Sequence, residues 1–165
     1  MKHYFPVLLV MLLMSIGVRA FVTQQDKNRP DKQPSHELIT EITLERKGCF
    51  HGTCPIYEVS FHKDGTATYV GRKYVVRLGQ YKGKVYPHQF NRLAKWLELQ
   101  GYFELQKNYA EGMSDAEESM TSVVRGNIRK TVYTRNTEDP PLELWGINAA
   151  IDDVVAHIEW KKEQK

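Results

Sequence analysis

The chain has 165 residues, a length typical of one domain, and a formal net charge of +3 from 23 basic and 20 acidic residues. Lys2 and Arg19 lie in an N-terminal stretch of 20 residues without an acid, so the remainder carries 21 basic against 20 acidic residues. Such a near-neutral remainder lacks the clustered basic face that nucleic acids require, so no nucleic-acid partner is expected.

The first 20 residues predict a signal peptide for export. Lys2 supplies a positive start, residues 5–18 are almost wholly apolar, and Val18-Arg19-Ala20 places small residues at the cleavage position. The apolar run is shorter than the roughly 18 residues of a spanning helix, so we expect cleavage and no stable membrane span. An uncleaved anchor is the alternative. Residues 21–35 are polar and include Pro30 and Pro34, which predicts a flexible linker in a periplasmic or secreted protein.

Residues 36–160 are predicted to form a single α+β domain, followed by a charged tail over residues 161–165. Apolar and polar residues alternate on both sides of the cysteines, with Ile42 and Leu44 in the first run and Val59 and Phe61 in the second. This period of two is typical of half-buried strands. Further strands are expected at residues 66–70, 74–78 and 80–86, and an Asp-Gly pair at residues 64–65 predicts a hairpin turn.

Two helices are expected after these strands. The first begins at Pro87 and ends at Gly101, which suits a left-handed helix end. The second follows Asp139 as its N-cap, with two prolines in its first turn. Apolar residues mark one face of each helix: Phe90, Leu93, Ala94 and Leu97 in the first, and Leu144, Ile147, Ile151, Val154, Val155 and Ile158 in the second.

The segment between the helices predicts a short extended stretch after Gly101, an irregular loop over residues 107–119, and a hairpin. The hairpin joins residues 120–125 to residues 128–134 through Gly126-Asn127. Strands followed by a helix, a hairpin and a helix predict an α+β fold, in which an antiparallel sheet of about five to six strands carries two helices on one face.

Both cysteines lie in one eleven-residue stretch, residues 47–57. In an oxidising compartment, two cysteines most often form a disulfide, and a bridge between Cys49 and Cys54 would contribute about 2 kcal/mol on the loop-entropy model. A metal site of Cys49, His51 and Cys54, with His62 as a further ligand, is the alternative, because thiolate and imidazole suit zinc or copper. We expect the disulfide, without metal or cofactor.

The run Gly48-Cys49-Phe50-His51-Gly52-Thr53-Cys54-Pro55-Ile56-Tyr57 resembles the Cys-Phe-Gly-x-Cys-Pro-x-Tyr signature of a bacterial exported family of unknown function, DUF6438. The resemblance continues through Asp64-Gly65-Thr66, Gly101-Tyr102-Phe103, Ser114-Asp115-Ala116, Thr121-Ser122-Val123 and Ile151-Asp152, covering about residues 41–158. His51 is one residue more than the signature has between its cysteines. The resemblance implies a compact domain of secreted or envelope proteins, and it brings no catalytic residues.

Two surfaces are candidates for binding. Basic and aromatic residues gather in the middle strands, where Tyr69, Lys82 and Tyr86 accompany the candidate binding surface of Arg72, Lys73, Tyr74, Arg77, Tyr81 and Lys84. The second is a candidate contact loop within residues 107–119, with Tyr109, Ser114, Asp115, Glu117 and Glu118. The opposite charges of the two could steer a partner, although an ordinary charged sheet face is the alternative for the first.

These patterns favour a non-catalytic binding module of the cell envelope, with an envelope protein or polymer as partner. A small hydrolase is one alternative, because Gly112-Met113-Ser114-Asp115-Ala116 partly matches Gly-x-Ser-x-Gly, and Asp115 with Glu117 or Glu118 could form a carboxylate pair. The last glycine of that motif is alanine, however, and no strand-turn-helix frame surrounds it. The metal-binding cysteine loop is the other alternative.

Overall fold

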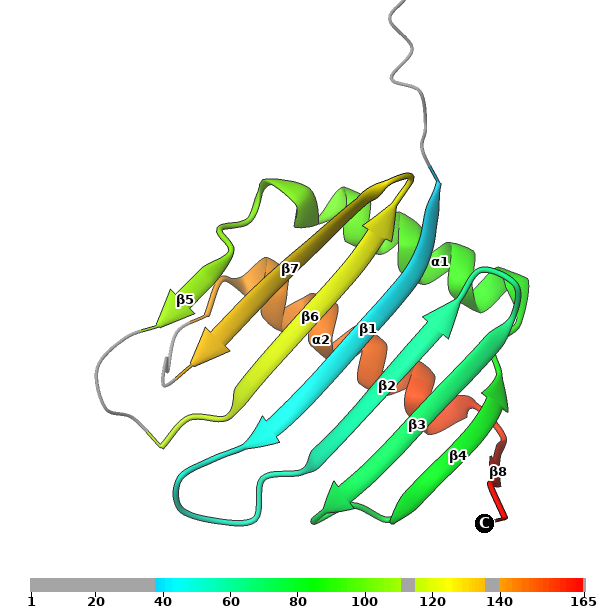
Figure 1. Ribbon diagram of the computed structural model, residues 1–165. Coiled ribbons are helices and arrows are strands. Elements are labelled where there is room, and N and C mark those ends of the chain that lie inside the picture. Colours follow the sequence, from blue (N-terminus) through cyan, green and yellow to red (C-terminus); the bar gives the residue numbers. More distant parts are fainter. Residues whose placement is uncertain (1–37, 111–114, 136–139, 165) are drawn as a thin grey trace, which may run out of the picture. The chain divides into compact units, whose positions relative to one another are not determined.

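The computed structural model describes residues 38–110, 115–135 and 140–164. The predicted signal peptide, the linker, Ser114 and Asp139 therefore lie outside the described residues. The chain between Ile39 and Lys162 forms one eight-stranded sheet in the order β5-β7-β6-β1-β2-β3-β4-β8. Helices α1 and α2 both lie against the same face of this sheet (Figure 1).

The strands are β1 (Ile39–Gly48), β2 (Ile56–His62), β3 (Thr66–Lys73), β4 (Gly79–Lys84), β5 (Asn108–Ala110), β6 (Glu118–Arg125), β7 (Ile128–Arg135) and β8 (Trp160–Lys162). The helices are α1 (Pro87–Leu99), α2 (Leu142–His157) and the 3-10 helix η1 (Tyr102–Glu104). The α+β class with two helices on one face is confirmed. The predicted strand number and the purely antiparallel sheet are wrong, because the sheet has eight strands and β5 pairs with β7 in parallel.

The core lies between the helices and the inner face of the sheet. Alternation places Ile42 and Leu44 of β1 beside Val59 and Phe61 of β2, and all four side chains are fully buried. The buried stripe of α1 is Phe90, Leu93 and Leu97, and that of α2 is Leu144, Ile147, Asn148, Ile151 and Val154. The period-two and helical patterns of the sequence therefore meet in one apolar layer.

The start of α1 agrees with its sequence signals. Pro87 occupies the first turn, and the backbone N–H of Tyr86 donates to Gln89 Oε1 at 3.0 Å. Gly101 adopts a left-handed φ of 64° just beyond the helix. The extended stretch expected next is instead η1, whose Tyr102 is fully buried and donates its hydroxyl proton to Thr121 O at 2.6 Å.

Two segments differ from the predicted strands because of local packing. Residues 74–78 form a bend between β3 and β4, in which Arg77 O approaches Gly71 so closely that a Cβ there would lie 1.8 Å from it. Residues 160–162, which span the expected end of the domain and the start of the charged tail, form β8 beside β4. Trp160 covers Gly83, where a Cβ would lie 2.8 Å from its ring.

The other face of the sheet is open and polar. Arg129 binds Glu41 at 2.8 Å, Arg72 binds Glu58 at 3.1 Å, and the hydroxyls of Thr43 and Ser60 lie 2.9 Å apart. Such alternation of apolar and polar faces is typical of antiparallel sheets packed on one side. It leaves the helix-covered side as the place where buried polar groups could form a site.

Candidate functional site

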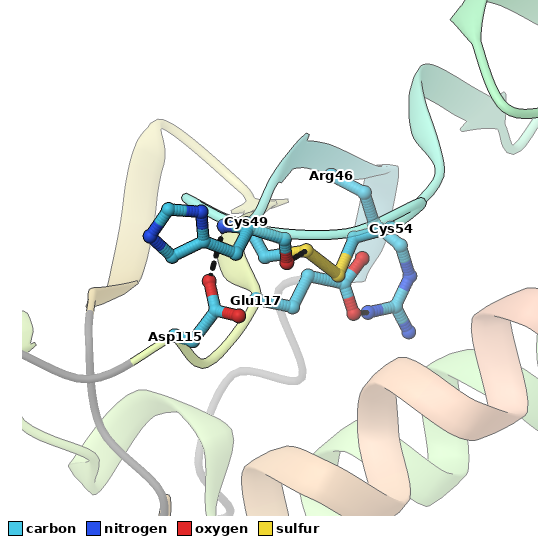
Figure 2. Close-up of a disulfide and its surroundings, with 6 residues drawn as sticks. Arg46, Cys49, Cys54, Asp115 and Glu117 are labelled. Carbon is cyan, nitrogen blue, oxygen red and sulfur yellow. Dashed lines mark hydrogen bonds and ion pairs between the residues drawn. A yellow bond between two sulfur atoms is a disulfide. The ribbon is translucent and has the colours of Figure 1, made fainter.

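The cysteine loop closes the end of the sheet where β1 passes into β2. The Sγ atoms of Cys49 and Cys54 lie 2.05 Å apart, so the pair forms a disulfide. Figure 2 shows the bridge above the side chains of Asp115 and Glu117. Both sulfurs are therefore bonded to each other and cannot ligate a metal as thiolates.

One described residue of the candidate contact loop, Asp115, lies directly against this disulfide loop. Asp115 accepts a hydrogen bond from the backbone N–H of His51, and Glu117 Oε2 lies 2.7 Å from Arg46 Nη1 (Figure 2). Of the other described members, Glu118 lies opposite Gly48 in the β1–β6 register and binds Arg135 at 3.2 Å, and Tyr109 accepts the N–H of Gln106. The two segments that looked independent in the sequence thus form one end of the domain.

Arg46 is the centre of a polar cluster beneath the loop. Its position continues the inward alternation of Ile42 and Leu44, so its guanidinium is directed toward α2 and is 15% exposed. It binds both carboxylate oxygens of Asp152 on α2, Glu117, and the hydroxyl of Tyr57 at 3.3 Å. Tyr57 in turn donates its proton to Asp152 Oδ1.

Burial and pairing shift the protonation of this cluster. Burial alone would lower the pKa of Arg46, but the hydrogen bond and charge of Asp152 hold that pKa above its ordinary range. Burial, followed by the Asp152 charge, raises the pKa of Tyr57. Burial also raises the pKa of Glu117, against the opposing attraction of Arg46. Burial thus disfavours the ionised form of Glu117.

A cleft of about 390 Å³ lies beside this cluster, between α2 and the ends of β1, β6 and β7. We name it the Arg46 cleft, and its lining is Arg46, Ala116, Glu117, Ser119, Thr134, Pro140, Trp145, Asn148, Ala149 and Asp152. Trp145 is 64% exposed and stands at its rim. Glu117 Oε1 is buried and accepts no hydrogen bond from any described residue.

The floor of the Arg46 cleft is a hydrogen-bonded set of neutral groups. Asn148 accepts from Thr121 Oγ1 at 2.6 Å and donates to Ser119 Oγ at 3.2 Å. Ser119 and Thr134 share a hydrogen bond of 2.8 Å between their hydroxyls. Each of these groups already has a hydrogen-bond partner, so the floor is rigid. Glu117 differs, because its Oε1 has no hydrogen-bond donor among the described residues.

The basic candidate binding surface is divided in the structure. Tyr81 lies on the inner face, 6.2 Å from Tyr69 in ring-centroid distance, whereas Lys84 lies on the exposed side of the same strand. The remaining members are near the β3–β4 connection: Arg72 pairs with Glu58, Lys73 stands 4.6 Å from the Tyr74 ring, and Arg77 belongs to the bend. The six residues therefore do not share one face of the sheet.

The described residues form neither the hydrolase site nor the metal site that were considered as alternatives. Ser114 lies outside them, and Asp115 already accepts the His51 N–H. His62 lies at the opposite end of β2 from the cysteine loop, opposite Glu41. Among the residues that the structure describes, no group of three His, Cys, Asp or Glu side chains could hold a metal ion.

The fold and site together define a disulfide-bridged α+β domain with a polar cleft at the bridged end of its sheet. The profile of a family described as a domain of unknown function (DUF6438) matches residues 40–155, and the chain belongs to this family. A search of curated proteins finds none that matches the chain. Within the described residues, no helix has the length and apolar character needed to cross a membrane.

Sequence reasoning missed Arg46 and Asp152 as members of the site. One signal was present: Arg46 follows Ile42 and Leu44 at the same period of two, so a charge falls on the buried face of a strand. An inward charge on a strand predicts a partner from the covering helix. Which helical residue supplies that partner required the fold.

Proposed function

We propose that the domain is a non-catalytic binding module of the cell envelope and that the Arg46 cleft is its ligand site. The ligand group is positively charged and donates hydrogen bonds, as the ammonium of a lysine side chain or of an amine-bearing envelope polymer does. The observation that carries this proposal is the buried Glu117 Oε1, which has no donor among the described residues and belongs to a side chain that lines the cleft.

A buried carboxylate oxygen without a donor is unfavourable, because it has lost its water and gained nothing in return. Its neighbour Arg46 already contacts Glu117 Oε2, Asp152 and Tyr57. A ligand that brings its own N–H groups to Oε1 would remove this penalty on binding.

The charges and the rim of the Arg46 cleft agree with a cation. Two carboxylates, Glu117 and Asp152, face one guanidinium, so the lining has an excess of one negative charge. The exposed face of Trp145 can attract a cation through its ring electrons. The volume of about 390 Å³ falls within the range of small-ligand pockets and is large enough for a single side chain.

The test uses Nα-acetyl-lysine amide, whose only charge is its ε-ammonium, added to isotope-labelled protein and followed by NMR. Resonances of Glu117, Trp145 and Asp152 are expected to shift, and the Nε-acetylated analogue is expected to cause no such shift. Glu117→Gln should weaken binding about tenfold or more, because it removes a charged acceptor. Glu98→Gln, an exposed acid on α1 outside the cleft, is the matched control and should bind as the wild type does.

Equal binding of the charged and neutral probes, or equal affinity of the wild type and Glu117→Gln, would contradict the proposal. Urea unfolding of each variant shows whether a loss of binding reflects a loss of folded protein. If Asp152 alone bound the cation, Glu117→Gln would have the same affinity as the wild type. The affinity of this variant therefore shows which of the two carboxylates binds the cation.

Binding should also depend on pH through Glu117. The cation needs the ionised carboxylate, and burial raises the pKa of Glu117 above that of an exposed glutamate. Affinity for the charged probe is therefore expected to fall as the pH decreases through a midpoint above the ordinary glutamate value. The same titration with Glu117→Gln should lack this step. A step that persists unchanged in this variant would assign the titration to another group.

A further inference from the structure

Helix α2 is apolar on more sides than the sheet covers. Its inner face buries Leu144, Ile147 and Ile151, yet Leu142, on the opposite side, is 81% exposed. Ala149 and Ala156 continue the same outward line at helical spacing and are exposed. The outer side also carries the exposed acids Glu143 and Asp153. Exposed apolar side chains with charged residues around them have the composition of an interface.

The outer side of α1 also exposes apolar side chains, among the charged residues Arg92, Lys95 and Glu98. Leu99 is 68% exposed and Trp96 is 39% exposed. A groove of about 470 Å³ runs between α1 and α2, and its apolar lining is Leu93, Trp96, Leu99, Ala150 and Val154. We name this groove, together with Leu142, the helix-layer patch. Exposed apolar side chains gathered in this way mark interaction surfaces more often than single ones do.

The charges around the helix-layer patch are separated by helix. Arg92 and Lys95 of α1 line the groove on one side, and Asp153 of α2 lines it on the other. Glu143 adds a second exposed acid in the first turn of α2. One side of the groove is thus basic and the other acidic, around an apolar centre.

We infer that the occupant of the helix-layer patch is a second copy of this chain, bound through a two-fold axis that runs along the groove. That rotation places α1 of each copy over α2 of the other. The basic side of one copy then faces the acidic side of its partner, twice over, which is the self-complementarity that an isologous interface requires. An acidic or a basic partner of another kind would match only one side of the groove.

The first test is the mass of the purified protein in solution, measured by sedimentation velocity over a range of micromolar concentrations. The wild type is expected to be a dimer. Leu99→Lys with Leu142→Lys is expected to weaken dimerisation about tenfold or more, since both replace exposed apolar side chains of the patch with charges. Val76→Lys, which replaces a 98% exposed side chain in the β3–β4 bend, is the control and should leave the dimer intact. A monomeric wild type would overturn the inference.

The second test distinguishes this arrangement from any other dimer by charge reversal. One variant carries Arg92→Glu with Lys95→Glu on α1, and the other carries Glu143→Lys with Asp153→Lys on α2. Each alone places like charges opposite one another and should be mainly monomeric. Mixing the two restores opposite charges at both contacts, so a heterodimer is expected. A dimer in either variant alone, or no association on mixing, would contradict the proposed axis.

Discussion

Arg46 places a charge on the face of β1 that otherwise buries aliphatic side chains. Its guanidinium joins Tyr57, Glu117 and Asp152, which come from three other parts of the chain. Burying a charged group costs free energy unless hydrogen-bonding and oppositely charged groups surround it. These three residues surround the guanidinium of Arg46 in this way. The cluster therefore fixes the position of α2 against β1 as well as the shape of the Arg46 cleft.

Replacing Arg46 with methionine should destabilise the domain by about 2–4 kcal/mol at neutral pH, because Glu117 and Asp152 lose their shared cation. Glu117 would then have a still higher pKa. A carboxyl group whose folded pKa is raised stabilises the fold most when protonated, so the variant should recover part of its loss as the pH falls. Urea unfolding at pH 7 and pH 5 measures this recovery.

Arg129→Met is the matched control for this prediction. Arg129 pairs with Glu41 on the open face, and its side chain is 52% exposed. An exposed ion pair contributes less than about 1 kcal/mol, so this variant should lose little. If Arg129→Met lost as much free energy of unfolding as Arg46→Met, burial of the ion pair would not determine the cost of removing its arginine.

At the scale of elements, strong periodicity and turn residues were reliable guides. Both helices and the hairpin at Gly126-Asn127 form near their predicted positions. The predicted start of α2 is wrong, because the helix begins at Leu142, and Pro141, with its extended ψ of 135°, is the N-cap and not part of the first turn. The short strands β5 and β8 were missed because three residues carry too little alternation to detect, and pairing with β7 and β4 makes them strands. The bend at residues 74–78 depends on the close approach of Arg77 O to Gly71, which no local pattern encodes.

Gly83→Ala should loosen β8 from the sheet. A Cβ at this position would lie 2.8 Å from the Trp160 ring, so the ring must move away from β4. We expect a loss of about 1–3 kcal/mol, as in other overpacked sites. Hydrogen exchange should accelerate for the amides that join β4 to β8. Gln80→Ala, an exposed residue on the same strand, is the control, and equal exchange in both variants would contradict the packing argument.

At the scale of the whole molecule, the candidate site was only partly predictable. The disulfide loop and the acidic loop were each recognised from composition, but their contact through Asp115 and His51 spans 64 positions. Arg46 and Asp152 are 106 positions apart. Periodicity reports which face of an element is buried, and it carries no information about which distant side chain will lie opposite. The basic surface shows the same limit, because its residues are near in sequence and divided in space.

The two edge strands of the sheet, β5 and β8, affect how readily the protein aggregates at high concentration. Strands β5 and β8 contain three residues each, and β8 carries Lys161 and Lys162. An incoming strand would gain few ladder hydrogen bonds there and would meet positive charge. Fibril growth by addition of a strand to β5 or β8 is therefore disfavoured.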